Sequence, residues 1–108
     1  MYFCDVENRE SKELAPGVYA KTFWQEKMLL SVVDLSPNAV VPMHSHPHEQ
    51  CGTVIFGEVT FTIGDETKVC KPGDTYIIPG GVAHEAIAGD MPTQVLDVFS
   101  PVREALKY

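Results

Sequence analysis

The sequence predicts an all-β protein, in the form of a sandwich, a barrel or a jelly roll, and three observations lead to this prediction. Turn-forming combinations of proline, glycine, asparagine and aspartate recur at short intervals along the 108 residues. The runs between these turns are rich in β-branched and aromatic residues, which favour strands. No segment sustains apolar positions at helical spacing, so we expect little helix.

The expected strands follow one another along the chain, at residues 28–35, 53–56, 59–63, 75–78, 84–87 and 93–99. In the third of these, Val59, Phe61 and Ile63 alternate with two threonines, which is typical of a strand with one face on a core. The chain then turns at residues 64–65, a Gly-Asp pair. Residues 102–108 favour one short helical turn or an edge strand.

Length and composition favour one globular domain spanning residues 1–108. Apolar residues make up 44% of the chain and charged residues 21%, which is the range of ordinary folded proteins. The longest apolar runs are far shorter than the roughly 20 residues of a membrane helix. The first residues lack the basic start and apolar middle of a secretory signal. We therefore expect a cytoplasmic protein without a membrane span.

The charge balance excludes some partners and draws attention to one arginine. A formal net charge of −7 repels the phosphate backbone, so we expect no nucleic-acid binding. The three cysteines form neither an even set nor a CxxC pair, which indicates free thiols, and we interpret Cys51 as a packing residue. Only Arg9 and Arg103 are arginines. If the ligand is an acid, Arg103 is the leading candidate to bind its carboxylate.

All four histidines lie in two short segments, residues 42–50 and 79–84. On an extended chain His44 and His46 point the same way, so they form a chelating pair that a third histidine, His84, would complete. Neutral imidazole suits several divalent transition metals. We therefore expect one metal ion, which would be nickel, zinc, manganese or iron.

The spacing around these histidines resembles the two motifs of the cupin family, G-x5-H-x-H-x3 or x4-E-x6-G and G-x5-P-x-G-x2-H-x3-N. Residues 38–57 and 73–88 keep every spacing, although Asn38, Gln50 and Ala88 replace a glycine, an acidic ligand and an asparagine. The resemblance implies a jelly-roll β-barrel for the whole chain. It also implies four metal ligands, His44, His46, Gln50 and His84.

Gln50 is the most informative departure from the pattern. A neutral amide in place of a carboxylate leaves the full positive charge on the metal, which favours Lewis-acid chemistry over oxygen activation. Strand alternation turns Glu49 to the opposite face, although a β-bulge would reverse this. We interpret His48 as a residue of the pocket rim that contacts substrate, with a role as metal ligand as the alternative.

A carboxylate stands in the middle of the last expected strand. Alternation places Val95, Asp97 and Phe99 on one face of residues 93–99, and the other face is also mostly apolar. A buried aspartate is either paired or functional, because an unpaired buried carboxylate is costly. If this face is the interior, Asp97 would move protons beside the metal and Phe99 would contact substrate. The alternative is a structural Asp97 bonded to a loop.

Two segments, Asp97-Val-Phe-Ser-Pro-Val-Arg-Glu104 and His44-Ser-His-Pro-His-Glu-Gln50, resemble a narrower group, the pectin degradation proteins. That family converts 4,5-unsaturated uronates from the cyclic to the linear keto form. The resemblance implies metal binding by the histidines and Gln50, proton transfer by Asp97 and a catalytic, carboxylate-binding Arg103. Two alternatives stay open, a metal-dependent dioxygenase or lyase and a metal-containing binding module without turnover.

Outward-facing apolar residues predict a homodimer. If Gln50 and Val54 face inward, alternation points four residues outward, namely Thr53, Ile55, Tyr76 and Ile78. Exposed apolar residues of this kind are better buried between two copies of the chain.

Overall fold

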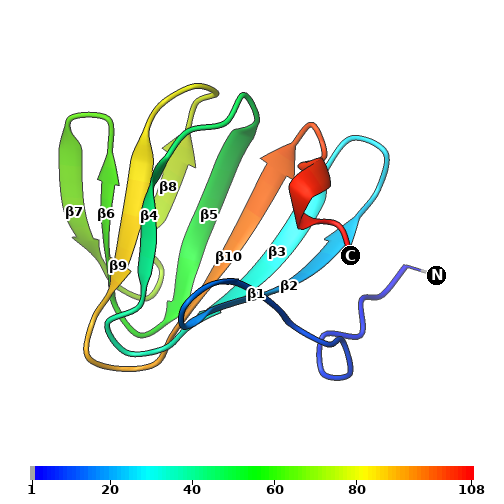
Figure 1. The fold of residues 1–108 in the computed structure, drawn as a ribbon, viewed down its shortest axis with the longest axis horizontal. Helices are drawn as coiled ribbons and strands as arrows, with labels where there is room; N and C mark the ends of the chain where they lie inside the picture. Colours follow the sequence, from blue (N-terminus) through cyan, green and yellow to red (C-terminus); the bar gives the residue numbers. More distant parts are fainter. Residues whose placement is uncertain (1) are drawn as a thin grey trace.

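The computed structural model describes residues 2–108 and has an all-β architecture (Figure 1). Ten strands and one short 3₁₀ helix follow one another in the order β1 (Lys12–Ala15), β2 (Val18–Trp24), β3 (Leu29–Leu35), β4 (Val40–His44), β5 (Glu49–Phe56), β6 (Val59–Ile63), β7 (Glu66–Cys70), β8 (Thr75–Ile78), β9 (His84–Ala88), β10 (Thr93–Ser100) and η1 (Glu104–Leu106). Among residues 2–108, no helix is long and apolar enough to cross a membrane.

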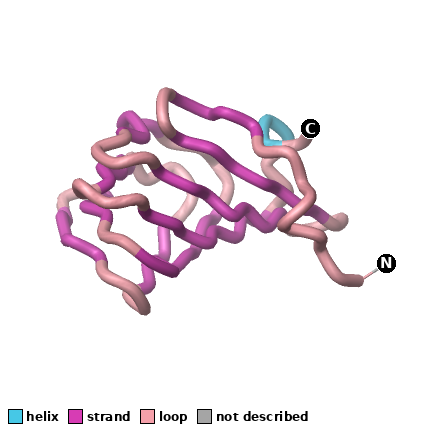
Figure 2. Tube along the Cα trace, turned by 90° about the horizontal axis from the view of Figure 1, so that it is seen from below, coloured by secondary structure: helices cyan, strands magenta, loops and turns pink. Residues whose placement is uncertain are grey.

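The strands form two antiparallel sheets in the predicted jelly-roll arrangement. The larger sheet has the order β1-β2-β3-β10-β5-β8 and the smaller one the order β4-β9-β6-β7. Figure 1 shows β4 and β9 facing the larger sheet, and Figure 2 shows that the described chain is almost entirely strand and loop. The short turn predicted within residues 102–108 is η1.

Four strands have no counterpart in the sequence prediction, namely β1, β2, β4 and β7. All four residues of β1 are at least partly exposed, and only Cys70 of β7 is buried, so neither strand shows the alternation of a half-buried strand. In β2 the buried positions hold Val18, Ala20 and Thr22, of which two are too small or too polar to mark an apolar face. Strands of this kind are defined by their partners rather than by their own pattern.

The inner face of the larger sheet is arranged in rows that run across its strands. Residues that are directly opposite in neighbouring strands share a face, so the register defines each row. One row is apolar and belongs to the main core, with Ala20, Val33, Val95 and Val54. The next row, which we call the polar row, contains Thr22, Ser31, Asp97, Gly52 and Tyr76. The row after it contains Leu29, Phe99, Gln50 and Ile78.

This register corrects the prediction about which residues face outward. Tyr76 and Ile78 are buried, with 8% and 0% of their surface exposed, because they lie opposite Gly52 and Gln50 on the inner face. The prediction assigned the alternation of β8 with an error of one residue, which exchanges its inward and outward positions. Ile77, which is 77% exposed, and Ile55 are the apolar residues that β8 and β5 turn outward.

The C-terminal tail packs against the larger sheet beyond its last row. Leu106 and Val102 form a second apolar cluster with Leu29 and Phe99. The Thr22 hydroxyl donates a hydrogen bond of 2.7 Å to the backbone carbonyl oxygen of Leu106. These contacts fix the tail segment that carries Arg103.

Candidate metal centre and cavity

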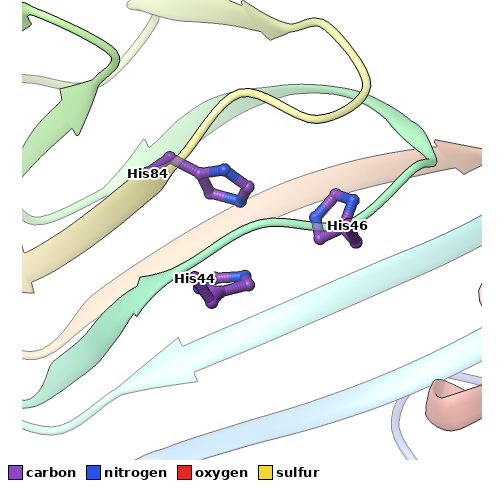
Figure 3. A group of neighbouring side chains, drawn as sticks. All are labelled: His44, His46 and His84. Carbon is purple, nitrogen blue, oxygen red and sulfur yellow. The ribbon is translucent and has the colours of Figure 1, made fainter.

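The three predicted histidine ligands lie together, and we call them the histidine cluster (Figure 3). His44 ends β4 and pairs with His84 at the start of β9, whereas His46 lies in the loop after β4. One ring nitrogen from each residue lies within 4.8 Å of the others. Imidazole nitrogens bind a metal ion such as zinc at about 2.0–2.1 Å. Three nitrogens that are this close together can therefore surround one ion after small movements of the rings.

Backbone carbonyls fix the orientation of all three rings. The Nδ1 atoms of His44, His46 and His84 lie 2.8, 3.1 and 2.9 Å from the carbonyl oxygens of residues 42, 48 and 82. A carbonyl only accepts, so each Nδ1 carries the proton and each Nε2 presents a lone pair. Burial lowers the pKa of His46 and of His84, which favours their neutral form. The buried Nε2 of His84 has no hydrogen-bond partner in the described part of the chain. These features fit a metal ion.

Gln50 brings an amide oxygen to the histidine cluster from the larger sheet. Its Oε1 atom lies 3.1 Å from the Nε2 atom of His46. Its side chain is also hydrogen-bonded to Asp97, and the amide NH₂ is the only group of Gln50 that can donate to a carboxylate. With the NH₂ group directed to Asp97, the oxygen faces the histidines. Two electron-pair donors at this separation are suited to a shared cation.

Asp97 lies behind Gln50 and is only 6% exposed. The Tyr76 hydroxyl donates a hydrogen bond of 2.5 Å to its Oδ1 atom. Burial raises the pKa of Asp97 to about 6, and the hydrogen bonds from Tyr76 and Gln50 together with the charge of Arg103 oppose this rise. Burial and the neighbouring Asp97 raise the pKa of Tyr76, so its hydroxyl keeps its proton. Asp97 is therefore a paired carboxylate whose two hydrogen-bond donors come from the adjacent strand β5 and from β8, the strand beyond it.

Gly52 makes room for this pair. A Cβ atom at Gly52 would collide with the Asp97 carboxylate and with the Tyr76 hydroxyl, and it would lie 2.7 Å from the backbone oxygen of Leu96. These neighbours include backbone and a buried hydrogen bond, neither of which can move cheaply. The close approach of Tyr76 to Asp97 therefore depends on a glycine between them.

A cavity of about 450 Å³ opens beside the histidine cluster. Its polar lining consists of Ser31, His44, Gln50, His84, Glu85 and Arg103, and the rest of the lining is mostly apolar. The guanidinium carbon of Arg103 lies 5.3 Å from the ring centre of Phe99, which also lines the cavity. Burial lowers the pKa of Arg103 and the charge of Asp97 raises it. The cavity thus combines one arginine and one glutamate with a mainly apolar wall.

The sequence-predicted residues divide into those that line the cavity and those that do not. His44, Gln50, His84, Phe99 and Arg103 line it. His46, Asp97 and His48 are not among the lining residues. The His48 ring lies against His46, with the ring centres 5.6 Å apart.

Sequence reasoning missed three residues of this region. Ser31 carried a signal, because it is the one polar side chain in phase with Leu29, Val33 and Leu35 on an otherwise apolar face. Gly52 and Tyr76 carried none, since their roles depend on the register between β5 and β8.

The chain is similar to known proteins over most of its length. The "Cupin domain" family model matches residues 31–99. KdgF from Halomonas sp. has a similar structure, with 26% identity, a TM-score of 0.91 and coverage of 97% of this chain and 99% of that one. An RmlC-like cupin from Shewanella frigidimarina covers 99% and 96% of the two chains with 24% identity and a TM-score of 0.92, which shows the shared fold.

A curated relative gives a match in sequence. "Germin-like protein 3-8" of Oryza sativa subsp. japonica is 35% identical over 75 residues, which are 63% of this chain and 33% of that protein. The chain therefore spans about a third of the length of this relative. The family model, by contrast, covers well over half of the chain, from within β3 to most of β10. The protein belongs to the cupin family.

Proposed function

We propose that His44, His46, His84 and Gln50 bind one divalent transition metal, which would be nickel, zinc, manganese or iron. Support comes from the shared orientation of the rings, from the orphan Nε2 of His84 and from the inward-facing amide oxygen of Gln50. All four ligands are neutral, so the bound ion would keep its full charge and act as a Lewis acid. We further propose that this centre serves an enzyme.

The proposed reaction is the conversion of 4,5-unsaturated uronates, of the galacturonate type, from the cyclic to the linear keto form. One observation carries this proposal, namely that the half-buried Arg103 lines the same cavity as His44 and His84 of the histidine cluster. Arginine binds a carboxylate in two-point geometry, and a uronate carries one carboxylate on its ring. The likeness to KdgF over nearly the whole of both chains supports the same assignment.

The reaction is an isomerisation in which one proton leaves and another enters. Loss of the proton from the anomeric hydroxyl opens the hemiacetal to an aldehyde, and the ring oxygen departs as an enolate. The enolate then takes a proton at C4 and becomes the ketone. Arg103 and Phe99 would hold the carboxylate and the ring, and the apolar lining would keep water away. Asp97, with a pKa of about 6, is suited to transfer a proton near neutral pH.

A second candidate function, a metal-containing binding module without turnover, is favoured by the position of Asp97. This carboxylate does not line the cavity and its hydrogen bonds orient Tyr76 and Gln50. In a binding module Asp97 would be a positioning residue for the amide of Gln50, and no proton transfer would be required of it.

The deciding experiment incubates metal-loaded protein with lyase-generated 4,5-unsaturated galacturonate and follows the loss of the double-bond absorbance. An enzyme is expected to exceed the spontaneous rate clearly, and Asp97→Asn is expected to reduce the rate by about 100-fold or more while the metal content stays unchanged. A wild-type rate equal to the spontaneous one would contradict the proposed activity. Loss of metal in Asp97→Asn would instead assign this residue to the positioning of Gln50.

We also propose that two copies associate through the outer face of β5 and β8. Ile55 and Ile77 are exposed there, and the cytoplasmic homodimer expected from the sequence would bury them. Light scattering at micromolar concentration is expected to give the mass of a dimer for wild type and of a monomer for Ile77→Glu. A monomeric wild type would contradict this proposal.

A further inference from the structure

The polar row contains two hydroxyl side chains on adjacent strands with very different surroundings. Thr22 and Ser31 lie directly opposite each other in β2 and β3, and each is 1% exposed. Thr22 donates its hydrogen bond to Leu106. The buried Oγ atom of Ser31 has no hydrogen-bond partner within residues 2–108. A buried hydroxyl without a partner costs free energy, so Ser31 calls for an explanation.

The structure itself offers no reason for a hydroxyl at this position. Ser31 lies between Thr22 and Asp97 in the register, but Asp97 takes its hydrogen bonds from Tyr76 and Gln50. An alanine would fill the same space without a buried, unpartnered oxygen. Unlike Thr22 and Asp97, however, Ser31 lines the cavity. Ser31 therefore lies in the wall of the cavity, next to any molecule that fills it.

We propose that Ser31 is a substrate-binding residue that forms a hydrogen bond to a ring hydroxyl of the bound acidic sugar. This inference rests on the proposed function and specifies how the same cavity selects its ligand. Arg103 would bind the carboxylate, and His44, His84 and Gln50 line the cavity on the side of the proposed metal. Ser31 would supply a hydrogen-bonding group on the inner face of β3. Phe99, Val33 and Leu106 also line the cavity and would provide apolar contacts to the bound sugar. Ser31 would distinguish a hydroxylated acid from an equally sized acid without hydroxyls, because the latter leaves Ser31 unpartnered.

The test measures binding of two inert acids to metal-loaded protein by calorimetry. D-galacturonate carries both a carboxylate and ring hydroxyls, whereas cyclohexanecarboxylate carries only the carboxylate. Ser31→Ala is expected to weaken binding of galacturonate about tenfold, as for the loss of one neutral hydrogen bond, and to leave cyclohexanecarboxylate unchanged. The matched control is Ser36→Ala, which removes an exposed hydroxyl just beyond the end of β3 and is expected to bind both acids as wild type does.

Thermal unfolding of the metal-free protein separates a binding role from a structural one. Removing an unpartnered hydroxyl is expected to leave the Tm of Ser31→Ala equal to that of wild type or above it. A lower Tm, or galacturonate binding equal to wild type, would overturn the role of Ser31. If wild type opens the ring of unsaturated galacturonate while Ser31→Ala binds galacturonate with full affinity, the role of Ser31 fails and the proposed function stands. If wild type neither binds galacturonate nor opens the ring, the proposed function fails with it.

Discussion

The histidine cluster and the polar row are built in different ways. The histidine cluster comes from one strand pair and the loop beside it, with His44 opposite His84 in the smaller sheet. The polar row crosses five strands of the larger sheet, from β2 to β8. The buried Nε2 atom of His84 has no hydrogen-bond partner in the described residues, whereas Thr22, Tyr76 and Asp97 satisfy one another or the backbone. In the proposed function, the histidine cluster would bind the metal and the polar row would hold the site in shape.

The largest expected effect is loss of the metal from the histidine side. His84→Ala removes one of three converging imidazoles, and metal affinity is expected to fall by at least about 100-fold, beyond the usual effect of losing an outer-shell partner. Metal titration calorimetry measures this change. His48→Ala is the matched control, because the His48 ring lies against His46 but His48 is not a member of the histidine cluster. Equal losses in both variants would contradict the assignment of His84.

A substitution at Gly52 tests the packing of the polar row. Gly52→Ala forces a methyl group against Asp97, Tyr76 and the backbone of Leu96, so the free energy of unfolding is expected to fall by about 2–3 kcal/mol. Chemical denaturation measures it. Gly89→Ala is the control, since its added methyl group would meet its nearest atom at 3.4 Å and should cost less than about 1 kcal/mol. A tolerated Gly52→Ala would show that the row is not tightly packed.

The smallest expected effect concerns the hydrogen bond from Tyr76. Tyr76→Phe leaves Asp97 with one donor fewer, which is expected to cost about 1–3 kcal/mol of stability. Metal affinity should fall by roughly tenfold if Asp97 orients the amide of Gln50. The exposed Tyr19→Phe provides the reference, with a change within about 0.5 kcal/mol. An unchanged metal affinity would separate the polar row from the metal site.

The same comparison explains how much could be predicted from the sequence. The all-β class was predicted from turns and alternation, and the jelly-roll form came with the resemblance to the cupin motifs. The nearness of His44, His46 and His84 was predicted from their grouping in two short segments. The roles of Gly52, Tyr76 and Ser31 were not predicted. Their neighbours come from strands that are distant in the sequence. The prediction placed Tyr76 outside because it assumed a phase for β8 that was wrong by one residue. The sequence pattern is local, whereas the polar row is made by pairing between strands.

The metal requirement of ring opening tests the central claim most directly. Chelator-stripped protein is mixed with 4,5-unsaturated galacturonate before and after addition of one equivalent of nickel, zinc, manganese or iron, and the loss of the double-bond absorbance is recorded. The proposed function predicts the spontaneous rate for stripped protein and recovery of the full rate with one equivalent of a suitable metal. A stripped protein that is as fast as the loaded one would contradict the account.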